Sequence, residues 1–99
     1  MVNMEKTGQR IVISFAGRLD ATNAQQVSRQ IDPALETIDR DVELNMEKLE
    51  YISSAGLQVV LKCAKAAKAA GRETWLHGAT GNVLEIFRLS GFLTFLKEE

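Results

Sequence analysis

The sequence has few of the residues that build covalent cross-links or metal centres. Cys63 is its only cysteine, so both an intrachain disulfide and a thiolate metal cluster are excluded. His77 is its only histidine, and no carboxylates cluster with it in the sequence, which argues against a metal site. We therefore expect neither a metal nor a cofactor.

An excess of charge of one sign is also missing. The formal net charge is −1 and 25% of the residues are charged, a balance that argues against nucleic acid as the main partner. No apolar run approaches the ~20 residues needed to span a bilayer. The start carries Glu5, Lys6 and Arg10 and has no apolar signal core. These absences predict a cytoplasmic protein that does not insert into a membrane.

What is present predicts one domain over residues 1–99, because 99 residues with 45% hydrophobic content suffice for a single core. Two extended segments, 2–7 and 10–16, flank a turn at Gly8. In the second segment apolar and less apolar side chains alternate, which indicates a well-buried strand.

A helical stretch follows Gly17, with a stripe of apolar residues at intervals of four, four and three: Val27, Ile31, Leu35 and Ile38. Pro33, the only proline, interrupts this stripe. It removes a backbone donor and predicts a kink, or a restart of the helix with Asp32 as its cap.

The remaining segments continue the alternation of strands and helices. We expect a strand over 41–46, an alanine-rich helix over 55–70 that stops at Gly71, and a short strand over 73–77. A helix over 83–89 and a last strand over 92–96 complete the order ββαβαβαβ. This order predicts an α/β fold with a mixed, mostly parallel sheet and helices packed against it.

Ser53 and Ser54 occupy the junction between the third strand and the alanine-rich helix, where sites gather in open α/β sheets. Either hydroxyl would serve as a helix cap, contributing ~1 kcal/mol. Alternatively, a serine here is a phosphorylation switch, because the first-turn N–H groups and the helix dipole would accept a phosphate. Residue types alone leave both interpretations open.

Three motifs in order resemble the STAS family, the anti-sigma factor antagonists. The run LNMEKLEYISSAGLQVVL over 44–61 resembles the strand, the serine-glycine-leucine loop and the helix start of that family. Gly17-Arg18-Leu19-Asp20 resembles its turn before the first helix, and Leu89-Ser90-Gly91-Phe92 the glycine-containing end of its last helix.

The resemblance implies a non-catalytic protein that binds a serine-kinase anti-sigma factor. That kinase would phosphorylate a loop serine, and a serine phosphatase would reset it. With Gly56-Leu57 fixed, Ser54 falls on the phosphoacceptor position. Ser53 stands where the family usually has aspartate and is the second candidate acceptor; Ala55 replaces the usual second serine. The expected partner-binding residues are Asp20, Thr22, Asn23, Tyr51, Ser53, Ser54 and Gly56, with Gly56 admitting a partner's backbone.

Two alternatives remain. A constitutive STAS subunit of a larger complex, such as a lipid-transport ABC system, would carry an unmodified loop. A small serine hydrolase would pair His77 with a serine, although the glycine-x-serine-x-glycine elbow is missing. Gly78–Asn82 lacks the ending of a phosphate-binding loop and is typical of a turn.

Several other residues allow two interpretations. Cys63 is typical of an inert buried thiol. Three lysines at intervals of three, Lys62, Lys65 and Lys68, form either a solvated helix face or a stripe for an acidic partner. Trp75 belongs either to the core or to a binding surface.

Overall fold

The computed structural model describes residues 1–99 and contains one five-stranded sheet with the strand order β1-β2-β3-β4-β5. Strand β1 (Val2–Lys6) runs antiparallel to β2 (Arg10–Leu19). The neighbouring strands β3 (Asp41–Ile52), β4 (Thr74–His77) and β5 (Lys97–Glu98) all run parallel to β2. The mixed, mostly parallel sheet and the predicted α/β class are therefore confirmed.

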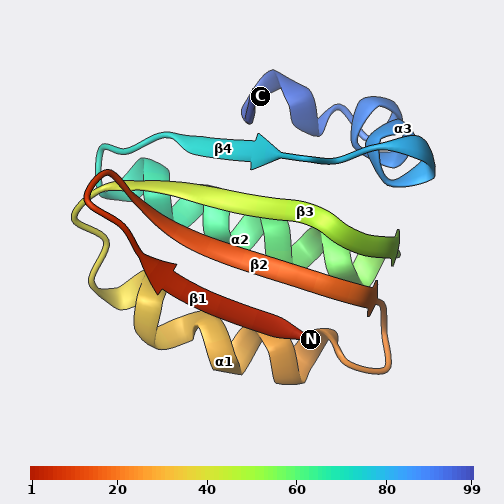
Figure 1. Cartoon of the computed structure of the whole chain (residues 1–99), viewed down its shortest axis with the longest axis horizontal. Helices are drawn as coiled ribbons and strands as arrows, with labels where there is room; N and C mark the ends of the chain where they lie inside the picture. The colour runs from red at the N-terminus through yellow and green to blue at the C-terminus, as the bar shows by residue number, and fades with distance from the viewer.

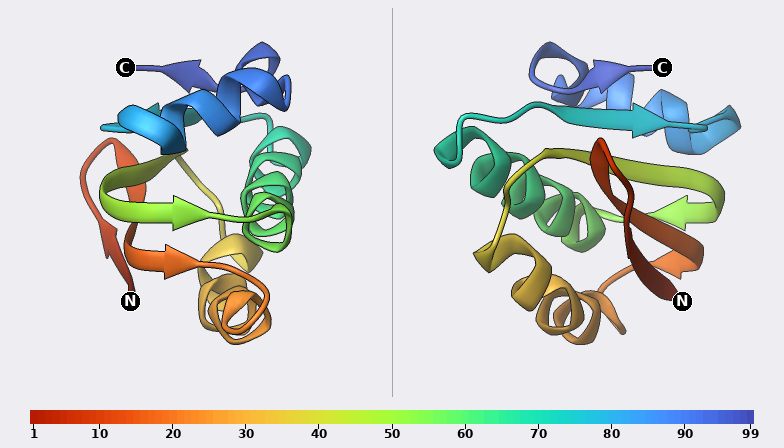
Figure 2. Two further views of the ribbon diagram at one scale, coloured as in Figure 1. Left: turned by 90° about the vertical axis from the view of Figure 1, so that its right-hand side faces the viewer. Right: turned by 60° about the vertical axis from the view of Figure 1, so that its left-hand side comes forward.

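Helices α1 (Ala24–Glu36) and α2 (Ser54–Ala69) lie side by side behind the sheet in Figure 1. Helix α3 (Gly81–Leu89) follows β4. It lies with the C-terminal segment beside β4, at the side of the sheet away from β1 (Figure 2). The opposite face of the sheet, which is toward the viewer in Figure 1, carries no helix. None of the helices combines the length and the apolar character that a bilayer crossing requires.

The core lies between the sheet and α1 and α2, because side chains on each strand alternate between the two faces. The predicted alternation in β2 is confirmed, with Ile11, Ile13 and Phe15 buried. The core also buries matching residues of β3 and the two helices, among them Val42, Leu44, Met46, Val27, Ile31, Val60, Cys63 and Ala67.

Strand β3 is twice as long as predicted, since it continues from Met46 to Ile52. The pairing with β2 shifts after Ser14, which pairs with Asn45, while Ala16 pairs with Lys48. Such a bulge adds residues to one strand and breaks the alternation of side chains. The alternation of apolar and polar residues stops at this bulge, and the sequence therefore predicted that the strand ends at Met46.

Pro33 lies inside α1, which is one continuous helix, so the predicted restart with Asp32 as a cap is wrong. Pro33 is exposed, and the helix continues through it although its ring leaves one helix carbonyl without an N–H donor. The Asp32 carboxylate forms an ion pair with Lys62 of α2 instead.

The predicted strand over 92–96 is also wrong. Phe92–Thr94 form a short 3-10 helix, η1, and the strand follows as β5. Gly91 has a φ of 80°, which turns the chain, and the Phe92 carbonyl then accepts the Leu96 N–H at 3.2 Å. The apolar side chains that suggested a strand pack instead as a small cluster, with the Phe92 and Phe95 ring centroids 5.0 Å apart.

Candidate functional site

Two loops meet at the carboxyl edge of the sheet and form the candidate site. One follows β2 and leads into α1, and the other joins β3 to α2. Because β2 and β3 are parallel neighbours, both loops lie at the same edge. The Ser53 N–H donates to the Leu19 carbonyl at 3.0 Å and ties the loops together. The structure thus brings together the two motifs that the sequence placed apart.

The two serines occupy different positions at the start of α2. Ser53 is the N-cap: its backbone is extended, and its Oγ accepts the Gly56 N–H at 3.5 Å. Ser54 is the first residue of the helix, is exposed, and its hydroxyl has no hydrogen-bond partner in the protein. Helix capping is therefore assigned to Ser53, and the Ser54 hydroxyl is left open to solvent.

Gly56 is buried, and the space beside its Cα is filled by the protein itself. A Cβ there would lie 2.6 Å from the Leu19 carbonyl oxygen and 2.7 Å from Cγ1 of Ile52. The atoms that come close to this glycine belong to β2 and β3. The expectation that Gly56 admits a partner's backbone is therefore wrong; the glycine lets α2 start against the sheet.

The loop after β2 is held by its own polar side chains. The Asp20 carboxylate accepts the Thr22 N–H at 2.9 Å and the Thr22 hydroxyl at 2.5 Å. The Asn23 amide accepts the Asp20 N–H at 3.0 Å and donates to the Arg18 carbonyl at 2.8 Å. The bonds from Thr22, with Arg18 next, lower the pKa of the Asp20 carboxyl group. Asp20, Thr22 and Asn23 therefore form a fixed turn, in which Thr22 is the exposed member.

Arg18 is a member of this site that the sequence did not single out. Its Nε lies 3.3 Å from the Asp20 carboxylate, and its guanidinium carbon lies 4.3 Å from the centroid of the Tyr51 ring. Tyr51 belongs to β3, pairs with Arg18 across the sheet, and is half-buried beneath it. We expected Tyr51 among the partner-binding residues, and the structure places it in the strand, half-buried. A cation–π pair covers it because both side chains leave the sheet on the face that carries no helix.

His77 lies away from the serines. It pairs with Asn45 of β3, and Ser53, the residue after the end of that strand, follows Asn45 by eight residues, or roughly 25 Å at the rise of a strand. A serine–histidine hydrogen bond of the kind a hydrolase needs is not formed.

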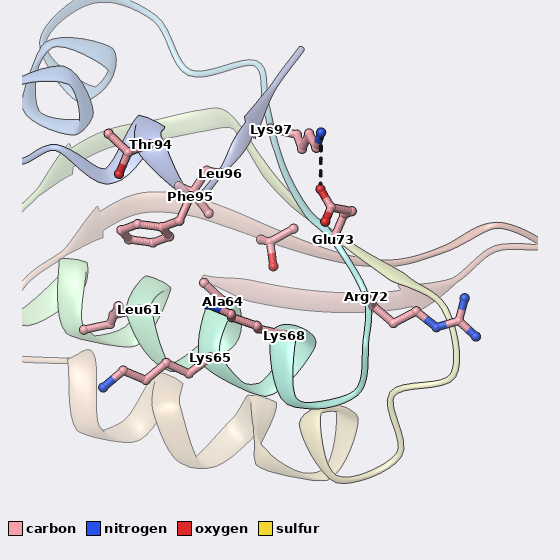
Figure 3. A pocket seen from close by; sticks show the side chains of 11 residues that line it. Leu61, Ala64, Lys65, Lys68, Arg72, Glu73, Thr94, Phe95, Leu96 and Lys97 are labelled. Carbon is pink, nitrogen blue, oxygen red and sulfur yellow. Dashed lines mark ion pairs between the residues drawn. The ribbon is translucent and has the colours of Figure 1, made fainter.

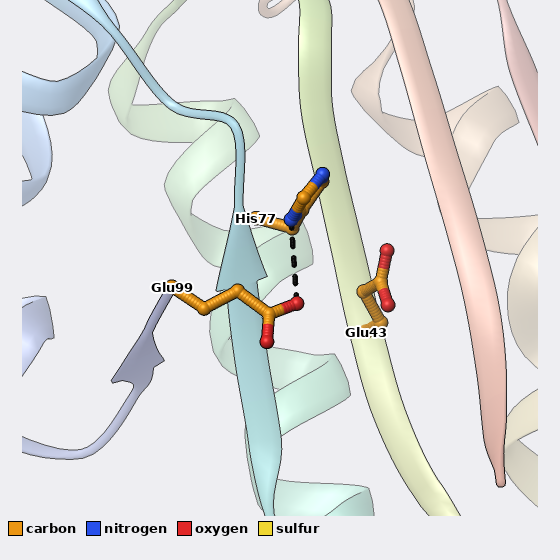
Figure 4. Close-up of side chains that lie close together, drawn as sticks. All are labelled: Glu43, His77 and Glu99. Carbon is orange, nitrogen blue, oxygen red and sulfur yellow. Dashed lines mark ion pairs between the residues drawn. The ribbon is translucent and has the colours of Figure 1, made fainter.

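His77 instead joins a polar cluster on the uncovered sheet face. Its ring nitrogens lie 3.3 Å from the carboxylates of Glu47 and Glu99. Potential ligand atoms of Glu43, His77 and Glu99 lie within 4.8 Å of one another (Figure 4). The Arg10 guanidinium already bonds both Glu43 and Glu99, at 3.0 and 2.7 Å. The two carboxylates thus have a resident cation, and the cluster serves to tie the C-terminal strand to β2 and β3.

Comparisons with known proteins agree with this fold. The family model described as Mlab, STAS domain, matches residues 2–97. BtrV of Bordetella bronchiseptica, a protein named as an anti-sigma factor antagonist, is 33% identical over 93 residues, which are 94% of this chain and 80% of BtrV. The anti-sigma-B factor antagonist of Staphylococcus aureus is 24% identical over 92 residues, covering 91% and 85% of the two chains.

Solved structures show the same architecture. A Thermotoga maritima structure described as an anti-sigma factor antagonist superimposes with a TM-score of 0.89 at 16% identity, over 98% of this chain and 84% of that one. Unphosphorylated SpoIIAA, also an anti-sigma factor antagonist, gives a TM-score of 0.77 at 21% identity, over 100% and 87%. The phosphorylated form of Bacillus SpoIIAA gives 0.76 at 23% identity, over 100% and 91%. The family match over residues 2–97, together with the 33% identity to BtrV, shows that this protein belongs to the STAS domain family.

Proposed function

We propose that this protein is a cytosolic anti-sigma factor antagonist, a non-catalytic binding switch that docks on a serine-kinase anti-sigma factor. Phosphorylation of Ser54 by that kinase would end the interaction, and a serine phosphatase would restore it. The single observation that carries the proposal is the exposed Ser54 hydroxyl, which forms no hydrogen bond at the first residue of α2, while Ser53 beside it caps the helix.

The position of Ser54 suits a modification that leaves the fold intact. The first turn of a helix has N–H groups without intrahelical partners, and its dipole favours negative charge by about 0.3–1 kcal/mol. No core side chain has to move, because Ser54 is exposed. A phosphate there would therefore be tolerated by the domain and would act on what binds it.

The proposed docking surface consists of the two tied loops. Its members are Ser54, the turn of Asp20, Thr22 and Asn23, and the Arg18–Tyr51 pair. They all lie at the carboxyl edge of β2 and β3. A phosphate adds about 1.5–2 negative charges to this surface. Such a charge, facing a partner's acidic or apolar surface, can cost several kcal/mol of binding free energy and so dissociate the complex.

Mapping the phosphorylated residue tests the proposal. The protein is incubated with its candidate anti-sigma kinase and ATP, and the modified peptide is sequenced by mass spectrometry. We expect modification of wild type and of Ser53→Ala, and none of Ser54→Ala. Modification elsewhere, or none by a kinase that binds the protein, would overturn the switch.

A constitutive STAS subunit is the second candidate, and the replacement of the usual aspartate by Ser53 and of the usual second serine by Ala55 favours it. This role predicts an ATPase that co-purifies with the protein and a loop that stays unmodified in cells. Intact-mass measurement of the native complex separates the two functions, because only the switch produces a phosphorylated population.

A further inference from the structure

A groove lies between the second half of α2 and the C-terminal segment, on the side of the molecule shown in Figure 3. It has a volume of about 660 Å³, within the range of ligand-binding clefts. Leu61 and Ala64 of α2 form one wall, and Phe95 and Leu96 form the other. The candidate site described above uses none of these residues.

Positive charge is concentrated around this groove. Its lining includes four cations, Lys65, Lys68, Arg72 and Lys97, and one carboxylate, Glu73, which pairs with Lys97 at 3.4 Å. The chain as a whole has a net charge of −1, so the groove is a local departure from the average. Such a concentration of one sign attracts partners of the opposite sign.

Three of these cations have no carboxylate partner in the protein. Lys65, Lys68 and Arg72 form no ion pair and no side-chain hydrogen bond, although Arg72 is near enough to contribute to the lowered pKa of Asp41. Lys62, the first lysine of the stripe, behaves differently, since it bonds the Ser28 hydroxyl at 2.7 Å and pairs with Asp32. The stripe thus divides into one lysine that ties α2 to α1 and two that remain available.

An apolar anchor point accompanies the charge. Phe95 is 45% exposed although it is a large aromatic residue, and its ring lies between α2 and the C-terminal segment in Figure 3. Phe92 packs against it, with ring centroids 5.0 Å apart. Supported, partly exposed aromatic residues are typical anchors of binding surfaces.

We propose that this groove is a second docking site, and that it binds an acidic segment of a partner protein that carries an aliphatic or aromatic side chain. The carboxylates would meet Lys65, Lys68 and Arg72, and the apolar side chain would pack on Phe95 and Leu61. Ser54 starts α2, and Lys65 and Lys68 follow 11 and 14 residues later, or about 16–21 Å along the helix axis. The groove therefore acts separately from the serine loop.

The test uses the whole protein and two fluorescein-labelled peptides of equal charge, EELDFDELE and EESDSDESE, in fluorescence anisotropy titrations. We expect the peptide with leucine and phenylalanine to bind at least about tenfold more tightly than the serine peptide, and binding to weaken in 0.5 M salt, as it does for charge pairs. Amide NMR shifts should map to residues 65–72 and 95–97.

Matched variants decide between the groove and general electrostatics. Lys65→Glu/Lys68→Glu should weaken binding about tenfold or more, whereas Arg29→Glu/Lys48→Glu, an equal charge change at exposed residues without ion pairs, should not. Phe95→Ala should lose affinity, and Leu89→Ala, at a residue 79% exposed and outside the groove, should keep it. Circular dichroism confirms that each variant is folded.

The possible results separate clearly. No binding of the apolar acidic peptide, equal binding of both peptides, equal losses in groove and control variants, or NMR shifts confined to residues 20–23 and 51–57 would each overturn the groove proposal. None of these results bears on the phosphorylation of Ser54, because the assay contains no kinase.

Discussion

Gly56→Ala is the sharpest structural test of how the serine loop is held. The added methyl group would lie 2.6 Å from the Leu19 carbonyl oxygen and 2.7 Å from Cγ1 of Ile52, well inside ordinary contact distances. The same carbonyl accepts the Ser53 N–H at 3.0 Å, so relief of the clash also strains the bond that ties the two loops together.

The expected magnitude follows from three effects. Overpacking of this kind costs about 1–3 kcal/mol. Weakening the hydrogen bond from Ser53 costs about 0.5–1.5 kcal/mol. Alanine regains up to about 1 kcal/mol as a better helix former than glycine. The net effect is a loss of about 2 kcal/mol of unfolding free energy, which for a domain of this size lowers Tm by about 10 °C.

Urea unfolding followed by the fluorescence of Trp75, the single tryptophan, measures this loss, and thermal circular dichroism checks it. Gly8→Ala is the matched control, because a methyl group at Gly8 would meet no atom within 4 Å and the residue has no positive φ. We expect the control to change stability by less than about 0.5 kcal/mol. Equal stability of Gly56→Ala and wild type would refute the close contact between α2 and β2.

The other predictions concern single side chains. Ser53→Ala should cost about 0.5–1 kcal/mol through the lost cap, whereas Ser54→Ala, at an exposed hydroxyl without a bond, should stay within about 0.5 kcal/mol of wild type in the same urea assay. Burial raises the pKa of the Cys63 thiol to about 12, so a thiol reagent at pH 8 should label the native protein far more slowly than the urea-unfolded protein; equal rates would show that Cys63 is accessible. Hydrogen bonds from the Glu73 N–H and then the Trp75 indole lower the pKa of the Asp41 carboxyl group. The stability that Asp41 contributes is present above its unfolded pKa near 4 and is lost as pH falls through the lower folded value, so Asp41→Asn should flatten the acid side of the stability profile.

Patterns within short stretches of sequence predicted most of the helices and strands. The alternation in Arg10–Ala16 and the alanine-rich stretch after Ser54 depend on neighbouring residues only, and both elements are present. Rules of this kind failed where pairing between strands decides the outcome. The bulge between the Ser14–Asn45 and Ala16–Lys48 pairs interrupts the alternation in β3, and the strand pairing near the C-terminus begins only at Lys97, after the turn at Gly91 and the 3-10 helix.

The candidate site divides in the same way. Helix capping allowed either serine to be the cap, and only the backbone geometry assigns that role to Ser53. The sequence did not indicate Arg18, because the register shift after Gly17 decides that Arg18 pairs with Tyr51 of the neighbouring strand. A signal did exist, since Leu19 and Ile52 are apolar and the residue before each must leave the sheet on the opposite face.

The burial of Gly56 shows a related limit of the sequence. A glycine in a loop motif suggests room for a partner, yet the space is filled by Ile52, four residues earlier, and by Leu19, which is far away in the chain. Contacts between distant segments are not encoded in any short window. Expectations about exposure are therefore less secure than expectations about the type of element.

The affinity for the candidate anti-sigma kinase, measured by isothermal titration before and after stoichiometric phosphorylation of the protein, tests the proposed switch most directly. We expect tight binding of the unmodified protein, a loss of at least about a hundredfold after phosphorylation at Ser54, and an unchanged Tm. Equal affinity of the two forms, or a phosphorylated form that no longer folds, would contradict the switch.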